Sequence, residues 1–442
     1  MKNRILLKLF AIGFLGLLLC IPLMMISGTI SERSYYRQTV IDEIARSDSG
    51  PQTINGPVLI VPYRTARWSI DNTPNRPREL VWTEHSVKIL PQKLSINGQL
   101  KTDQRQRGIY RATVYGTDLQ LDGTFQIPPL LGVNTKEVEG FEMGQPVLAV
   151  GIADIRGIKQ SPKSRWNSQA ITFEPGTQLP QLGSGIHARV PDVTEAGGTV
   201  PFQLSLKLSG MDNLNFMPLG RDTDVSLTSS WRHPSFFGQY LPESRTIDKN
   251  GFQASWKTSW FATNANERFQ QCLGGNCENF NTMQLGVKLM DPVDSYVMSG
   301  RSVKYGFLFV FLTFGAFFLF EALKRMAVHP VQYGMVGLAL ALFFLLVVSL
   351  SEHIPFAAAY ATAAIACVTL NGFYVAHALK HRLRGLGFAG LLGALYGLLY
   401  LLLQSEDYAL LLGSLLLFLL LAVAMVLTRK VDWYQLGQAN EN

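Results

Sequence analysis

The chain has 442 residues, of which 48% are hydrophobic and 16% charged, and its formal net charge is +7. This length excludes a single ordinary domain and suits two or three. The cationic excess flanks apolar blocks, so the charge indicates the orientation of membrane spans and argues against nucleic-acid binding.

The chain begins with a short basic segment, residues 1–8, which is followed by an apolar block over residues 9–30. A helix needs about 20 apolar residues to cross a hydrocarbon core about 30 Å thick, so 9–30 predicts a first transmembrane helix. A cleaved signal peptide usually has a shorter apolar core, and Met25-Ile26-Ser27 is a poor cleavage site. A lipoprotein would need a small residue before Cys20, where Leu19 stands. We therefore expect an uncleaved anchor.

Residues 31–50 predict a juxtamembrane amphipathic helix. Tyr36, Val40 and Ile44 recur every four residues, which makes one helical face apolar. The pattern ends at Ser49-Gly50-Pro51. We expect this helix to extend the first span as a stalk and to pack on the following domain.

Residues 51–302 change to the alternating apolar pattern of β-strands, as in Leu119, Leu121, Phe125 and Ile127. We expect an all-β domain, built either as a sandwich or as two packed β-lobes with a seam near 155–170. The dipeptide Asn97-Gly98 predicts a two-residue hairpin turn inside this region.

Two cysteines, Cys272 and Cys277, lie five residues apart around a Gly-Gly pair. On an oxidising side of the membrane they predict a small disulfide loop. Zinc is the alternative, but two cysteines with no nearby histidine supply only half a site. We predict no metal and no cofactor.

Signals for catalysis are weak in this region. The histidines His85, His187 and His233 have no Gly-x-Ser-x-Gly nucleophile near them. Asp154 has the spacing to pair with Arg156 or to sit in a turn, but nothing marks it as an acid or a base. We therefore predict no catalytic residue and no enzyme.

Aromatic residues are dense near the end of the β-region. They predict a partner-binding face, because aromatic rings can stack on sugars or contact lipid. The alternative is that they form part of the β-core and a contact with the membrane interface. The candidate residues are Trp231, Phe236, Phe237, Tyr240, Trp256 and Trp260.

Residues 303–428 predict a bundle of five further transmembrane helices, and residues 429–442 a tail. The expected spans are 303–320, 331–350, 355–376, 386–404 and 408–427. Turns rich in Lys and Arg alternate with turns that lack them, so we expect six spans in all, with both termini cytoplasmic and the β-domain outside.

Few polar residues interrupt these spans. Gln332 and Asn371 lie within them or at their edges, and Glu352 lies at a helix end. Ionisable groups that serve transport usually lie deeper in the bilayer. A transporter or lipid-handling permease with a periplasmic gating domain is therefore the alternative function and not the first.

The chain resembles the CreD family of bacterial inner-membrane proteins over nearly its whole length. The resemblance rests on several short motifs spread along the chain. They are Ser49-Gly50-Pro51-Gln52, Gly151-Ile-Ala-Asp154-Ile-Arg156-Gly157, Trp231-Arg-His-Pro-Ser-Phe236, Ser259-Trp-Phe261, His329-Pro-Val-Gln-Tyr333 and Leu350-Ser-Glu-His353.

This resemblance implies a multi-pass protein of the bacterial inner membrane that supports cell-envelope integrity and takes part in the envelope stress response. It also implies colicin tolerance on overproduction and a link to the β-lactam response. The resemblance implies no enzymatic activity. The expected partners are the lipid bilayer and an unknown periplasmic or membrane component that the β-domain binds. The pair Cys272 and Cys277 is not a feature of the resemblance.

Overall fold

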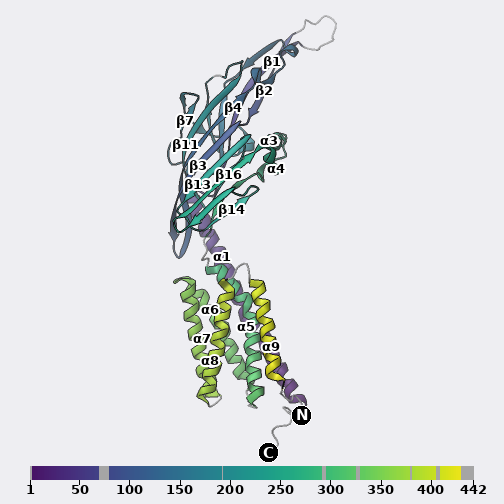
Figure 1. Cartoon of the computed structure of the whole chain (residues 1–442), viewed down its shortest axis with the longest axis vertical. Coiled ribbons are helices and arrows are strands. Elements are labelled where there is room, and N and C mark those ends of the chain that lie inside the picture. The colour runs from purple at the N-terminus through teal and green to yellow at the C-terminus, as the bar shows by residue number, and fades with distance from the viewer. Residues whose placement is uncertain are drawn as a thin grey trace, which may run out of the picture. The chain divides into compact units, whose positions relative to one another are not determined.

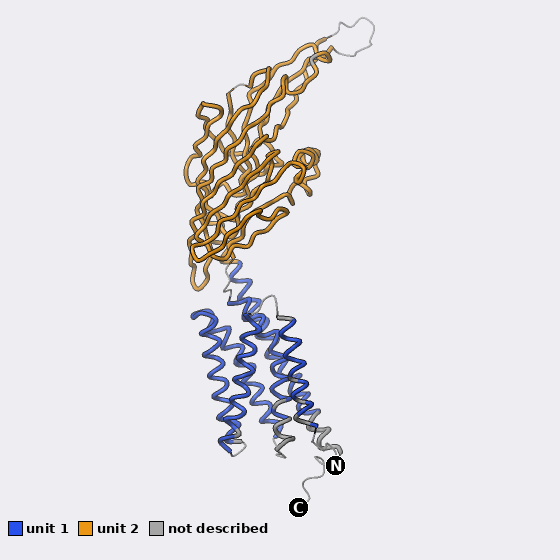
Figure 2. Tube along the Cα trace, in the orientation of Figure 1, with its two compact units in different colours: residues 1–38, 293–442 blue, residues 39–292 orange. Residues whose placement is uncertain are grey.

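A computed structural model of the chain divides into two compact units, residues 1–38 with 293–442 and residues 39–292 (Figure 2). The structure describes residues 2–68, 79–191, 193–290, 295–324, 329–378, 381–404 and 409–429. The first unit is helical and the second is rich in β-strands. The protein thus combines several apolar helices with one large β-rich domain.

Apolar helices form the first unit (Figure 1). They are α1 (Lys2–Ser47), α5 (Ser295–Lys324), α6 (Pro330–Ser351), α7 (Phe356–Ala378), α8 (Arg382–Gln404) and α9 (Ala409–Thr428). Residues 39–47 of α1 belong to the second unit. Within the described residues, the segments long and apolar enough to cross a membrane are Phe10–Ser47, Pro330–Ser351, Phe356–His377 and Gly385–Gln404. Helix α9 adds a shorter apolar stretch, Leu411–Val423. The count of six spans stays a prediction, and the predicted turns around Lys380 and Glu406 and the tail after Arg429 lie outside the described residues.

Two sheets build the β-rich unit. Sheet A has the order β14-β17-β12-β1-β6-β10-β9, and β2 and β5 also pair with β1. Its strands are β1 (Gln52–Trp68), β2 (Leu80–Ile89), β5 (Gly140–Met143), β6 (Val147–Ile152), β9 (Glu174–Pro175), β10 (Gly185–Arg189), β12 (Asn213–Met217), β14 (Pro234–Gly238) and β17 (Leu285–Leu289).

Sheet B has the order β15-β16-β13-β3-β4-β11-β7-β8. Its strands are β3 (Lys93–Arg107), β4 (Tyr110–Ile127), β7 (Lys163–Trp166), β8 (Gln169–Ile171), β11 (Gly198–Met211), β13 (Asp222–Ser229), β15 (Ser244–Asp248) and β16 (Gly251–Ser259).

The two sheets share one hydrophobic core. The predicted alternation on β4 is confirmed, since Leu119, Leu121, Phe125 and Ile127 are at most 1% exposed. They pack in one cluster with residues of sheet A such as Ile54. The chain passes between the sheets many times, with β7 and β8 in sheet B and β9 and β10 in sheet A. The two-lobe alternative with a seam near 155–170 is therefore wrong, and the unit is a single sandwich.

The hairpin predicted at Asn97-Gly98 is also wrong, because β3 runs through this dipeptide without a turn. A Cβ atom at Gly98 would lie 2.7 Å from Leu227 Cδ2 and 2.9 Å from Leu119 Cδ2. Glycine is present there because core side chains approach the backbone closely. The chain turns instead at Gly108, which has a φ of +62° between β3 and β4.

Short helices form a third layer on the outer face of sheet A, so the all-β expectation needs correction. They are α2 (Trp260–Thr263), α3 (Ala265–Leu273) and α4 (Glu278–Asn281), and Figure 1 shows α3 and α4 together beside the strands. Phe269 and Phe280, both fully buried, pack with Val58 and Met217 of sheet A. Helix α3 buries Ala265, Phe269 and Cys272, which share one helical face.

Candidate functional site

The end of α1 is joined to the sandwich by the side chain of Asp154. Its Oδ2 accepts a hydrogen bond from the Gly50 amide at 3.0 Å. Its Oδ1 accepts from the Arg156 amide at 3.1 Å and from Arg156 Nε at 2.9 Å. The Gln52 side chain donates to the carbonyl oxygens of Asp154 at 2.9 Å and Ser209 at 3.0 Å. Asp154 therefore both pairs with Arg156 and caps the short turn Ile155–Gly157.

Arg156 extends this contact to the last turn of α1. Its Nη1 donates to the Arg46 carbonyl at 2.5 Å, and its Nη2 lies 3.4 Å from the Ala45 carbonyl. Carbonyls in the last turn of a helix have no intrahelical donor and carry partial negative charge, which a guanidinium stabilises. Lys159 adds an ion pair with Asp48 at 2.5 Å. We call this group (Asp154, Arg156, Gly50, Gln52 and the end of α1) the helix junction.

The helix junction holds Asp154 in its ionised form. The hydrogen bond from the Arg156 side chain is the main cause that lowers the pKa of Asp154 to about 2, and the Gly50 amide adds to the effect. Gly157 follows the pair because a Cβ there would lie 2.3 Å from the Ser209 carbonyl oxygen. Two motifs far apart in the sequence, 49–52 and 151–157, thus form one structural unit.

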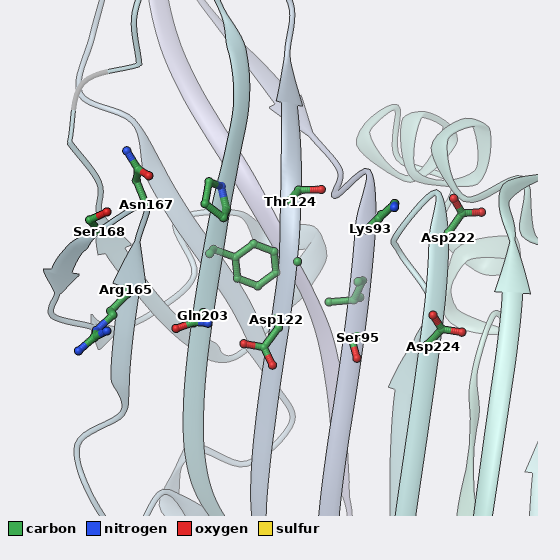
Figure 3. A pocket seen from close by; sticks show the side chains of 14 residues that line it. Lys93, Ser95, Asp122, Thr124, Arg165, Asn167, Ser168, Gln203, Asp222 and Asp224 are labelled. Atoms are coloured by element: carbon green, nitrogen blue, oxygen red, sulfur yellow. The ribbon is translucent and has the colours of Figure 1, made fainter.

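A second candidate site is a hollow on the outer face of sheet B, with a volume of about 760 Å³ (Figure 3). Strand register places one polar row across five neighbouring strands. A second row lies beside it and begins at Asn167 in the β7–β8 turn. The first row is Arg165, Gln203, Asp122, Ser95 and Asp224, and the second is Asn167, Pro201, Thr124, Lys93 and Asp222. We call this hollow the polar trough.

The charged side chains of the polar trough are of both signs: Lys93, Arg165, Asp122, Asp222 and Asp224. Within the part of the chain that the structure describes, these five form no ion pair and no side-chain hydrogen bond. Partial burial raises the pKa of Asp122. The trough is therefore lined by donors and acceptors that have no partner in the described chain. The spacing in sequence gave no signal of it, since its residues come from five strands.

The structure separates the six aromatic residues of the expected partner-binding face. Trp256 is 1% exposed and belongs to the core, where its ring centroid lies 5.7 Å from that of Phe236. Trp231 is half-buried and its Nε1 donates to the Met290 carbonyl at 3.0 Å. Phe237 and Tyr240 are also half-buried. These residues do not form one exposed face, because strand alternation directs some of them inward.

The exposed aromatic residues near this region are Trp260, 38% exposed, and Phe261, 88% exposed. The Arg221 guanidinium lies 4.5 Å from the centroid of the Trp260 ring. Trp260 and Phe261 are adjacent residues at the start of α2.

The three histidines of the sandwich lie apart, and two of them have local hydrogen-bond partners. His85 Nε2 lies 3.1 Å from Thr65 Oγ1, and His187 Nδ1 lies 2.7 Å from the Gly176 carbonyl oxygen. His233 is exposed and precedes β14. Among the described residues, no three His, Cys, Asp or Glu side chains are grouped as metal ligands.

Cys272 and Cys277 form a disulfide in the structure. Cys272 is fully buried against Phe269 and Phe280 in the third layer. The bond links α3 to the residue before α4, so it fixes the turn between these two short helices.

In the helical unit, Glu352 connects three helices. Its Oε1 accepts a hydrogen bond from Tyr296 of α5 at 3.0 Å and lies 3.8 Å from Arg33 Nε of α1. Gln332 takes part in the cap of α6 with His329, whereas the buried Asn371 donates to the Cys367 carbonyl at 3.0 Å. The hydrogen bonds of Gln332 and Asn371 are local, so they do not join the two side chains into one polar path.

Apolar helices of membrane-spanning length and a large β-rich domain define an integral membrane protein. A family model described as "Inner membrane protein CreD" matches residues 4–434. The Inner membrane protein CreD of Escherichia coli K12 is 37% identical over 439 residues, which cover 98% of this chain and 95% of that protein. The chain belongs to the CreD family of inner membrane proteins, which confirms the resemblance seen in the sequence.

Similarity to solved structures is weaker. An M1 zinc metallopeptidase from Deinococcus radiodurans, crystallised with a peptide substrate, aligns over 38% of this chain and 38% of its own. The identity is 10% and the TM-score is 0.19, so this alignment carries no structural or functional argument.

Proposed function

We propose that this protein is a non-enzymatic, multi-pass protein of the bacterial inner membrane that supports cell-envelope integrity. Its β-sandwich lies in the periplasm and binds an envelope component. Six spans with both termini in the cytoplasm follow from the alternation of basic turns along the chain. Colicin tolerance on overproduction and a link to the β-lactam response are part of this proposal.

The helix junction is the observation that carries the proposal. Arg156 binds both the Asp154 carboxylate and the last-turn carbonyls of α1. The last turn of α1, which belongs to the β-rich unit, is therefore bonded to the sandwich. The chain enters this domain from the apolar part of α1 and leaves it into α5, so we expect the domain to bind a component near the membrane.

Two further observations support a binding role over catalysis. The relative from Escherichia coli is named as an inner membrane protein. The histidines of the sandwich make separate local contacts, to Thr65 and to the Gly176 carbonyl.

The test is complementation of an envelope defect. In cells that lack this protein, we expect leakage of a periplasmic marker or sensitivity to detergent, which the intact chain restores. The double variant Asp154→Ala/Arg156→Ala should restore it several-fold less well at equal membrane abundance, because the sandwich is no longer bonded to α1.

The matched control is Asp118→Ala/Lys207→Ala, an opposite-charge pair that faces across β4 and β11 outside the helix junction. This control should complement fully. Full complementation by the junction variant would contradict the proposed role of the anchored sandwich.

A further inference from the structure

The polar trough presents more hydrogen-bonding groups than the fold uses. Register places Arg165 and Asp122 on either side of Gln203, and Ser95 between Asp122 and Asp224. Opposite charges thus share one row, yet no side chain of this row pairs with another among the described residues. Figure 3 shows these side chains rising from neighbouring strands on the same side of the sheet.

The position of the trough decides how a ligand can be held. The edges of sheet B are β15 and β8, whereas the trough lies over β7, β11, β4, β3 and β13. Each of these five strands already pairs with a neighbour on both sides. A peptide cannot add there as an extra strand, so recognition depends on side chains.

The size of the trough indicates an elongated ligand. Five neighbouring strands at about 4.8 Å spacing span about 19 Å. The floor offers no exposed aromatic ring, because Phe202 in the lining is 1% exposed. Binding therefore depends on hydrogen bonds rather than on ring stacking.

The charges of the trough select against strongly charged chains. Three carboxylates repel a polyanion such as nucleic acid, which binds through clustered Lys and Arg. Two cations, Lys93 and Arg165, interrupt the acidic groups and disfavour a polycation. A hydroxyl group both donates and accepts, so one hydroxyl can donate to Asp122 and accept from Arg165 or Gln203.

We infer that the polar trough binds a hydroxyl-rich, net-neutral saccharide chain. This inference rests on the proposed function, since it names the chemical class of the envelope component. Hydroxyls of successive sugar units form hydrogen bonds with the polar side chains of the two rows, which begin at Arg165 and Asn167.

The test uses the full-length protein in detergent micelles and titrates cellohexaose, hexalysine and hexagalacturonate by calorimetry. We expect binding of the neutral cellohexaose, with a dissociation constant that changes less than about twofold between low and high salt. Arg165→Gln/Asp122→Asn should weaken binding at least about tenfold, because two charge-assisted hydrogen bonds are lost. Gln203→Ala, which changes no charge, should weaken it several-fold.

The matched control is Lys207→Gln/Asp118→Asn, which likewise removes one positive and one negative charge from the same face but lies outside the trough. Equal loss in this control, no saccharide binding, or preferential binding of hexalysine or hexagalacturonate would overturn the inference. Should saccharide binding fail while complementation still depends on the helix junction, the proposed function stands with a different ligand. If the saccharide binds but the intact chain does not complement the envelope defect, the proposed function is overturned and the saccharide site stands.

Discussion

Replacement of Trp256 by alanine should lower the free energy of unfolding of the sandwich by about 3–5 kcal/mol, the usual cost of removing a large buried aromatic side chain. Trp256 is 1% exposed and packs against Phe236 in the core shared by both sheets. The truncation removes these contacts and leaves a cavity. A partner-binding role would predict instead a stable protein with a binding defect.

This effect is measured by thermal unfolding of the full-length protein in detergent, with unfolding of the sandwich detected by its susceptibility to proteolysis. The control is Phe261→Ala, because Phe261 is 88% exposed and its loss should change stability by no more than about 0.5 kcal/mol. Equal stability of the Trp256 and Phe261 variants would contradict the placement of Trp256 in the core.

Replacement of Asp154 by alanine should destabilise the helix junction by about 2–3 kcal/mol, because hydrogen bonds to a charged group are worth about 1.5–3 kcal/mol. The Gly50 amide and the Arg156 guanidinium both lose their carboxylate partner. Hydrogen exchange of residues 45–52 should rise in Asp154→Ala and stay unchanged in Asp118→Ala, which lies on the exposed face of β4. Equal exchange in the two variants would show that the junction does not depend on Asp154.

The helix junction should also weaken in acid. The pKa of Asp154 is lowered from 3.8 to about 2. A lowered carboxyl pKa contributes stability that is fully present above the ordinary pKa and is lost as the pH falls towards the folded value. Protection of residues 45–52 in the wild type should therefore fall between about pH 4 and about pH 2. Asp154→Asn should remove this dependence, and an unchanged profile in that variant would assign it to another group.

Part of this fold follows directly from local patterns. Alternation on β4 identifies its buried residues, because a strand in a sandwich presents every second side chain to the core. The same logic fails at Gly98, where an Asn-Gly pair looks like a turn but lies inside a continuous strand. Leu119 and Leu227 fill the space that a side chain would need, and these contacts come from distant parts of the chain.

Local patterns do not predict the third layer, for a related reason. Ala265, Phe269 and Cys272 have helical spacing, but a nine-residue helix between strands is too short for this period to distinguish it from a loop. Its burial depends on the outer face of sheet A, which local patterns do not reveal.

The two candidate sites differ in how much of each can be predicted from the sequence. The motifs around Gly50 and Asp154 were visible, but these residues are 104 positions apart and meet only through the register of β1 and β6. The polar trough draws on residues from Lys93 to Asp224. Single Ser, Gln and Asp residues on exposed strand faces are common, so only the register of five strands brings them together.

We propose above all that the sandwich lies in the periplasm and that both chain termini and the turn before α8 lie in the cytoplasm. Single cysteines at Ser168 and at Arg382, in a chain with Cys20→Ser and Cys367→Ser, can be treated with a membrane-impermeant thiol reagent in intact spheroplasts. The account predicts labelling of Ser168→Cys without lysis and labelling of Arg382→Cys only after the membrane is opened. Labelling of Arg382→Cys in intact spheroplasts, or of Ser168→Cys only after lysis, would contradict it.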